Sequence, residues 1–299
     1  MTIAFISHPD CAAYAAGAEH PDVPARLGAI QDQLLSTGLD LALRHCDAPL
    51  ATREQLCRAH AADYVDRVFD GLAVDGAEVG QQLLNAALRA AGAAVLAVDL
   101  VLSGRSTSAF CSVRPPGHHA ERDCGMGFCV FNNLAVGALH ALHGHGLTRV
   151  AVVDFDAHFG NGTDAILGGM PEVLQCSLFQ YPFYPYALPE HDDARAVHIR
   201  LPASGDGARL REEVTARWLP RLDEFRPELV MISAGFDAHA EDDMADLLLH
   251  ERDFAWMTHR LRECAERHAQ GRIVSVLEGG YAPAALGRCV AAHLDALLG

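Results

Sequence analysis

The stretch VVDFDAHFGNGT, residues 152–163, places three polar side chains directly after an apolar run. Asp154, Asp156 and His158 follow the β-rich segment Val150–Val153. Residues two apart in an extended chain lie on the same face, so these three can point the same way. A buried charge without a partner costs several kcal/mol even after relaxation. The group therefore needs compensation, either from a metal ion or from the hydrogen bonds of a structural turn.

On both sides of this stretch, apolar β-rich segments alternate with helical ones, which indicates an α/β fold. The predicted strands are Ile3–Ile6, Ala109–Val113, Arg149–Val153, Val173–Leu178, Leu229–Ser233 and Ile273–Leu277. The predicted helices are Leu83–Leu102, Asn133–Gly146, Arg252–Ala269 and Ala284–Leu298, and Thr52–Gln55 has the form of a capping box before another. We expect one domain over residues 1–299, with a mostly parallel central sheet and helices on both of its faces.

Composition excludes several classes of function. The net charge of −16 over 299 residues disfavours nucleic acid and anionic membranes as partners, and could favour cationic substrates. No uninterrupted apolar run approaches the ~20 residues of a membrane span, and the start of the chain lacks the pattern of a signal peptide. The nine cysteines show no disulfide framework. We therefore expect reduced thiols and a cytoplasmic protein, and the sequence leaves open whether it forms a homo-oligomer.

Three further polar clusters lie at the ends of predicted strands, where parallel sheets bind ligands. They are RPPGHHAERDCGMGFCVFNN (residues 114–133), SAGFDAH (233–239) and LEGGY (277–281). Each has an ordinary explanation by itself. Asp237 suits a helix N-cap, the paired histidines suit a surface, and the two glycines suit a simple turn. Four such clusters on separate strand ends of one chain are much more specific together.

Taken together, these motifs resemble the histone deacetylase family, within the arginase–deacetylase fold. The resemblance covers nearly the whole chain, from EHPDVPARLGAI (residues 19–30) to EGGY. RPPGHHAER, MGFCVFNN and SAGFDAH are similar to the class II branch, including its bacterial members.

The resemblance implies a role for each matching residue. Asp156, His158 and Asp237 match three zinc ligands, with Fe²⁺ as the alternative metal. His118 and His119 match the paired histidines that handle protons, and Asp154 and Asn161 match their respective partners. Tyr281 matches the tyrosine that donates a hydrogen bond to the substrate carbonyl. The same turn resembles a potassium site, built from backbone carbonyls of residues 154, 156 and 158 and the Ser177 hydroxyl.

A substrate tunnel is implied as well. Gly127 matches the residue whose carbonyl accepts the substrate N–H, and Phe128 and Tyr184 match the two aromatic walls. Met244 matches the rim position at which polyamine-specific members carry a glutamate, so that cation-reading group is absent. Three positions depart from the usual pattern: Phe159 stands for a histidine that is no metal ligand, Asp243 for a frequent proline, and Tyr184 for a frequent phenylalanine.

The implied activity is zinc-dependent hydrolysis of an amide, which releases acetate or a longer acid. The implied substrates are acyl-lysine in a protein or a small acylated amine, with acetylpolyamine hydrolysis as the alternative. Two rivals remain open. An arginase-like dinuclear hydrolase would need more Asp ligands around the same turns. A silent acyl-lysine-binding protein would be expected to have lost Tyr281 or a metal ligand, and none is lost.

Overall fold

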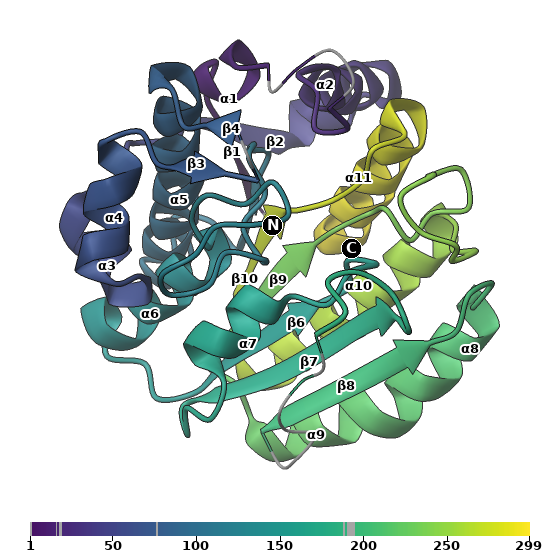
Figure 1. Cartoon of the computed structure of the whole chain (residues 1–299). Coiled ribbons are helices and arrows are strands. Elements are labelled where there is room, and N and C mark those ends of the chain that lie inside the picture. Colours follow the sequence, from purple (N-terminus) through teal and green to yellow (C-terminus); the bar gives the residue numbers. More distant parts are fainter. Residues whose placement is uncertain (1, 16, 18–19, 76, 188, 190–194) are drawn as a thin grey trace.

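The computed structural model describes residues 2–15, 17, 20–75, 77–187, 189 and 195–299. Eight strands form one parallel sheet in the order β2-β1-β5-β10-β9-β6-β7-β8 (Figure 1). Their bounds are β1 Ile3–Ser7, β2 Leu43–Asp47, β5 Ser108–Cys111, β6 Val150–Asp154, β7 Val173–Gln180, β8 Ala196–Leu201, β9 Leu229–Ala234 and β10 Ile273–Leu277. A separate antiparallel pair joins β3 (Ala73–Val74) and β4 (Ala77–Glu78). The predicted α/β fold is confirmed, and the main sheet is parallel throughout.

Helices cover both faces of the sheet (Figure 1). Their bounds are α1 Asp10–Ala13, α2 Ala25–Thr37, α3 Arg53–Ala59, α4 Ala62–Phe69, α5 Gln81–Leu102, α6 Asn133–His145, α7 Asn161–Leu167, α8 Gly207–Glu213, α9 Leu219–Phe225, α10 Glu251–His268 and α11 Pro283–Leu298. A 3₁₀ turn (Leu39–Ala42) follows α2, and a π-helical turn (Val214–Trp218) joins α8 to α9. The four long helices predicted from the sequence match α5, α6, α10 and α11 to within two residues.

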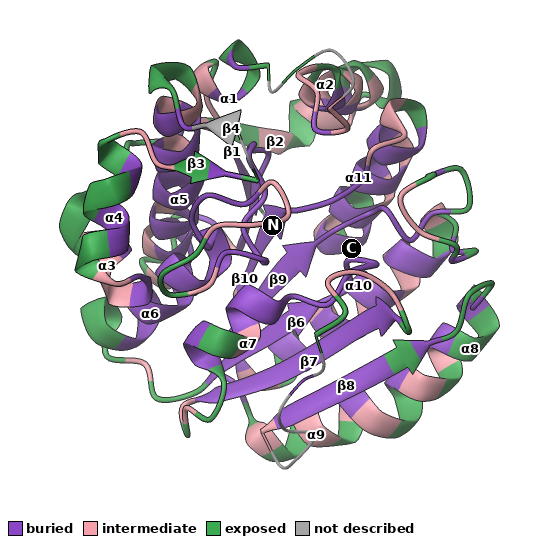
Figure 2. Cartoon of the chain, viewed as in Figure 1, coloured by how far each residue is buried: buried purple, intermediate pink, exposed green. Residues whose placement is uncertain are grey.

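Alternation along the strands divides the core into two layers. In β6, Val150 and Val152 pack with α5 and α6, whereas Ala151 and Val153 pack with α10 and α11. The central strands are buried on both sides (Figure 2), as strands covered by helices on both faces must be. Helix α5 is long and apolar enough to cross a membrane, but 78% of its most apolar window is buried in this core. That burial is typical of a core helix.

The short pair β3–β4 was not predicted, and neither were two strands of the main sheet, β2 and β8, which lie at its two edges. β2 has the sequence LRHCD and is partly exposed, so it carries no apolar run. β8 has the sequence AVHIRL, in which His198 and Arg200 interrupt the β pattern. An edge strand lacks a neighbour on one side, so its sequence carries less of the signal by which the central strands were found.

The helix expected after Thr52 is divided in two. The capping box forms as predicted, with Gln55 N–H donating to the Thr52 hydroxyl and the Gln55 side chain accepting from Thr52 N–H. The chain then becomes extended at His60. The His60 ring bonds the Glu121 carbonyl at 2.8 Å through Nδ1 and accepts the Asn132 N–H at 2.9 Å through Nε2. These long-range bonds hold the 114–133 segment against α3, and local sequence patterns do not report them.

Candidate active site

The four polar clusters follow four neighbouring strands. β5, β10, β9 and β6 lie side by side in the sheet, and the segments that follow them are the ones that contain RPPGHH, EGGY, SAGFDAH and DFDAH. Because the strands are parallel, these segments all begin at the carboxyl ends of the strands, on the same side of the molecule (Figure 1). The sheet order thus brings together motifs that are far apart in the sequence.

Asp156, His158 and Asp237 form a compact buried group. His158 Nδ1 lies 3.0 Å from Asp156 Oδ1 and 3.1 Å from Asp237 Oδ2. One candidate ligand atom from each residue falls within 4.8 Å of the other two. All three side chains are buried, and His158 also lines a cavity of about 510 Å³.

Backbone amides hold both carboxylates in place. Ala157 N–H donates to Asp237 Oδ1 at 2.8 Å, and Gly279 N–H donates to Asp156 Oδ2 at 2.9 Å. Position 279 must be glycine, because a Cβ there would lie 2.0 Å from Asp237 Oδ2 and 2.6 Å from Asp156 Oδ2. The glycine of EGGY therefore allows the β10 turn to approach the two acids.

This donor set fits a divalent metal ion. His158 Nε2 lies 3.1 Å from the Met244 carbonyl, so Nε2 carries the hydrogen and Nδ1 is the atom aimed at the two acids. A carbonyl partner of this kind is what fixes the ring of a metal-binding histidine. Two carboxylates offset a dication, and three protein ligands beside a cavity leave room for water and substrate. Asp156, His158 and Asp237 are thus the residues that would hold the metal.

His118 lies beside this group and is paired with an acid. Its Nδ1 is 3.0 Å from Asp154 Oδ2. Burial by itself would lower the pKa of His118, but the carboxylates of Asp156 and Asp154 outweigh it and raise the pKa to about 10. His118 is therefore charged at neutral pH in the metal-free protein.

His119 is held in the opposite protonation state. Its Nδ1 donates to Asn161 Oδ1 at 2.8 Å, which leaves Nε2 as the free acceptor. The amide cannot flip, because Asn161 Nδ2 donates to the Glu121 carboxylate at 2.7 Å. Burial, followed by the neighbouring His118 cation, lowers the pKa of His119 well below its usual value. The pair thus contains one charged ring and one neutral ring.

Glu278 supports the loop that carries both histidines. This carboxylate is fully buried and accepts N–H bonds from Gly117 at 2.6 Å and His118 at 3.1 Å. The Ser233 hydroxyl donates to its other oxygen at 3.1 Å. Burial raises the pKa of Glu278 to about 7. The residue links the ends of β10, β9 and β5, which sequence reasoning on EGGY overlooked.

Arg26 holds the Tyr281 ring and its backbone in place. The Arg26 guanidinium lies 4.7 Å from the centre of the Tyr281 ring and donates from Nε to the Gly280 carbonyl at 2.6 Å. Arg26 is itself paired at 2.6 Å with the buried Asp22. Burial raises the pKa of the Tyr281 hydroxyl well above its usual value. Tyr281 therefore keeps its proton at neutral pH and is available as a hydrogen-bond donor.

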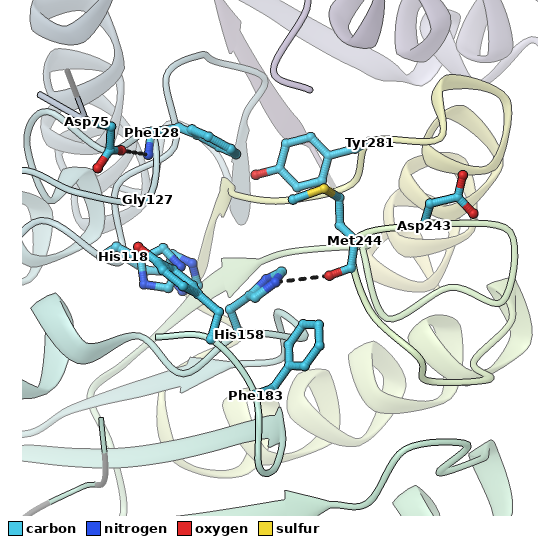
Figure 3. A pocket seen from close by; sticks show the side chains of 11 residues that line it. Asp75, His118, Gly127, Phe128, His158, Phe183, Asp243, Met244 and Tyr281 are labelled. Carbon is cyan, nitrogen blue, oxygen red and sulfur yellow. Dashed lines mark hydrogen bonds between the residues drawn. The ribbon is translucent and has the colours of Figure 1, made fainter. Parts of the chain in front are cut away.

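A cavity of about 510 Å³ opens over these groups (Figure 3). Its aromatic walls include Phe128 and Tyr184, as expected, and also Phe183, which sequence reasoning missed. The Tyr184 ring lies 5.2 Å from the ring of His119, and the Phe183 ring lies 5.6 Å from that of His158. Gly127, with a positive φ of 55°, also lines the cavity. A Cβ at Gly127 would lie 2.4 Å from the His119 ring, so only glycine fits there.

The rim of the cavity is partly acidic. Asp75 and Asp243 both line it and are exposed, and Asp75 accepts the Phe128 N–H at 2.8 Å. Met244 also lines the cavity, with its side chain directed toward Tyr281 (Figure 3). The Asp243 carboxylate points away from His158 in the same view. Met244 therefore contributes its side chain to the cavity and its carbonyl to His158.

Two residues of the predicted potassium site, Ser177 and Asp154, lie side by side on β7 and β6. The Ser177 hydroxyl is buried and has no hydrogen-bond partner among the described residues. Ser177 pairs with Asp154 in the β6–β7 register, and both border a small cavity. An unsatisfied buried oxygen is compatible with a cation ligand, so the potassium site stays a prediction.

Phe159 takes the place of the expected second histidine. Its ring packs 4.9 Å from the ring of Phe179, away from the cavity. This substitution therefore removes no group from the candidate site.

Two other groups of possible metal ligands occur in the described part of the chain, and their bonding argues against a metal. In the group Asp99, His140 and His145, Arg58 lies 2.7 Å from His140 Nδ1. Arginine can only donate, so His140 Nε2 must carry the hydrogen. In the group His239, His250 and Glu251, the Glu241 N–H donates to His239 Nδ1, with the same consequence for His239 Nε2. The Asp156 group alone has its histidine donor atom aimed at both acids.

Comparison with known proteins assigns the chain to a class of amide hydrolases. It is 39% identical over 302 residues to a histone deacetylase-like amidohydrolase of Pseudomonas aeruginosa, with 96% of this chain and 78% of that protein covered. It is 34% identical over 329 residues to the human polyamine deacetylase HDAC10, with all of this chain and 48% of the human protein covered.

The family model of the histone deacetylase domain matches residues 20–297. The solved HDA15 HD domain superposes with a TM-score of 0.92 and 28% identity, and the match covers 99% of this chain and 88% of that one. The chain therefore belongs to the histone deacetylase family, as the sequence motifs indicated.

Proposed function

We propose that this protein is a zinc-dependent amidohydrolase that removes acetyl or other acyl groups from acylated lysine side chains or related amines. One observation carries the proposal. His158 of the Asp156–His158–Asp237 group, His119 with its Nε2 acceptor, and Tyr281 all line one aromatic-walled cavity. Family membership supports deacetylation as the reaction, and the donor set supports zinc as the metal.

A divalent metal held by these three ligands supplies Lewis acidity, which makes water a stronger acid and an amide carbonyl a better electrophile. The neutral His119 accepts a proton from the attacking water at Nε2. The Tyr281 hydroxyl donates a hydrogen bond to the oxyanion that develops on the acyl carbon. A protonated histidine then delivers a proton to the leaving nitrogen as the C–N bond breaks. The products are a carboxylic acid and a free amine.

The aromatic lining of the cavity supports a substrate with an alkyl chain. Phe128, Phe183 and Tyr184 surround a slot suited to an alkyl chain, and Met244 adds an apolar, adaptable surface. The acidic rim and the net charge of −16 attract cations over a distance, which raises encounter rates more than selectivity. Acyl-lysine is therefore the preferred substrate in this proposal. A polyamine substrate is the second candidate, because the human relative is named a polyamine deacetylase.

Substrate preference is tested at Met244. We expect the wild-type protein to have a higher kcat/KM for an acetyl-lysine peptide than for acetylspermidine. Met244→Glu introduces a carboxylate that can pair with a distant ammonium, and we expect it to shift the ratio toward acetylspermidine by about fivefold, the value of a partly exposed ion pair.

Met244→Gln is the matched control, because it has the same size without the charge. A wild type that already favours acetylspermidine would contradict the proposed substrate. A glutamate variant that behaves like the glutamine variant would contradict the role of the rim position.

A further inference from the structure

Asp242 connects two segments that both carry groups of the candidate site. Its Oδ2 accepts the N–H of Tyr281 at 2.5 Å and that of Ala282 at 3.0 Å. Its Oδ1 accepts the N–H of Met244 at 3.0 Å. The residue is only 5% exposed and does not line the cavity. One buried carboxylate therefore fixes the backbone after β10 and the backbone of the loop after β9.

Each segment positions a different part of the chemistry. The segment after β10 contains Tyr281, whose hydroxyl is the expected hydrogen-bond donor to the substrate. The loop after β9 contains Met244, whose carbonyl accepts from His158 Nε2 at 3.1 Å and so orients Nδ1, the atom that would bind the metal. His158 is linked to Tyr281 through three hydrogen bonds, the backbone of Met244 and the carboxylate of Asp242. Asp242 thereby sets the position of the tyrosine relative to the metal ligands.

A carboxylate is required at position 242 because both of its oxygens accept backbone hydrogen bonds. Asparagine is nearly identical in shape but has one acceptor oxygen and one amide group that donates. Its amide group would face either Met244 N–H or the N–H pair of Tyr281 and Ala282. A buried donor would then lose its partner, which is destabilising and displaces one of the two segments.

We propose that Asp242 is a positioning residue that holds Tyr281 and His158 in register, acting only through the backbones of residues 281 and 244. This inference rests on the proposed function. It assigns Asp242 no contact with substrate or metal. In the metal-loaded protein, the loss of Asp242 should therefore lower kcat only while Tyr281 has a hydroxyl to position. Through His158, the same loss should separately weaken metal binding.

The test is a double-mutant cycle on the metal-loaded protein. We expect Asp242→Asn to lower kcat by about tenfold with KM changed less than about twofold, because the misplaced group is one that acts in the transition state. In the Tyr281→Phe background the same substitution should change kcat by less than about threefold. Glu241→Gln is the control, since the carboxylate of this exposed neighbour accepts from Arg288 at 2.7 Å and the substitution should leave kcat unchanged.

Metal affinity gives a second readout that needs no activity. Competition with a fluorescent chelator should show Zn²⁺ bound about tenfold more weakly by Asp242→Asn than by wild type. Equal losses of kcat in both backgrounds, or unchanged zinc affinity, would overturn the inference. If Asp242→Asn does not fold, Asp242→Ser goes through the same measurements, because its hydroxyl still accepts from one segment. An inactive wild type that nevertheless shows the zinc shift would contradict the proposed function and leave the positioning role standing.

Discussion

Replacing Tyr281 with phenylalanine is expected to lower kcat for an acetyl-lysine peptide by about 100-fold or more, the typical loss when one oxyanion donor is removed. The ring would remain, and with it the Arg26 contact at 4.7 Å and the backbone bonds to Asp242. Zinc content and melting temperature should therefore change little. Steady-state kinetics together with metal analysis measure all three quantities.

Tyr186→Phe is the control for that experiment. This tyrosine is 78% exposed and does not line the cavity, so its hydroxyl should not affect turnover. If Tyr281→Phe kept the wild-type kcat, the tyrosine would have no part in the reaction. A fall in kcat accompanied by loss of zinc would instead indicate a structural role for the hydroxyl.

The largest effect is expected at the three ligand positions. Asp156→Ala, His158→Ala and Asp237→Ala should each lower zinc content far below one ion per chain and reduce turnover to background. Each substitution removes one of three donors whose ligand atoms lie within 4.8 Å of one another. Atomic emission analysis after dialysis, run beside the activity assay, measures both outcomes.

Asp99→Ala provides a matched control, because Asp99 also lies in a group with two histidines. There the Arg58 bond to His140 argues against a metal, so zinc content and turnover should remain at wild-type levels. A ligand variant with full zinc and a normal rate would show that the substituted residue is not a ligand.

Much of the fold was predictable because the central strands are strongly patterned. β6, β9 and β10 are continuous apolar runs, and their predicted bounds agree with the structure to within one residue at each end. The edge strands β2 and β8 were missed because polar residues such as His198 interrupt them. Helices α1, α2, α7, α8 and α9 were also not predicted. The apolar sequence pattern was therefore most informative where a segment is buried on both faces.

The residues of the candidate site were also predictable to different degrees. Residues that touch the cavity, such as His119 and Tyr281, belong to motifs that resemble the family closely. Asp154 and Asn161, which bond the two paired histidines, were matched as well, but the residues that hold those partners and the histidine loop in place were overlooked. Glu121 fixes the Asn161 amide, and Glu278 fixes the loop of His118, but each acts across more than 35 positions of sequence. Only the sheet order shows that these segments meet, although both glutamates lie inside the quoted motifs.

We propose that amide hydrolysis depends on a metal held by the Asp156–His158–Asp237 group. Acetate release from an acetyl-lysine peptide, measured while metal-free wild-type protein is titrated with Zn²⁺, tests this dependence. We expect no turnover without metal, a linear rise up to one equivalent, and a plateau beyond it. Turnover that persists in the metal-free protein, or that stays absent after one equivalent of Zn²⁺ or Fe²⁺ has bound, would contradict the account.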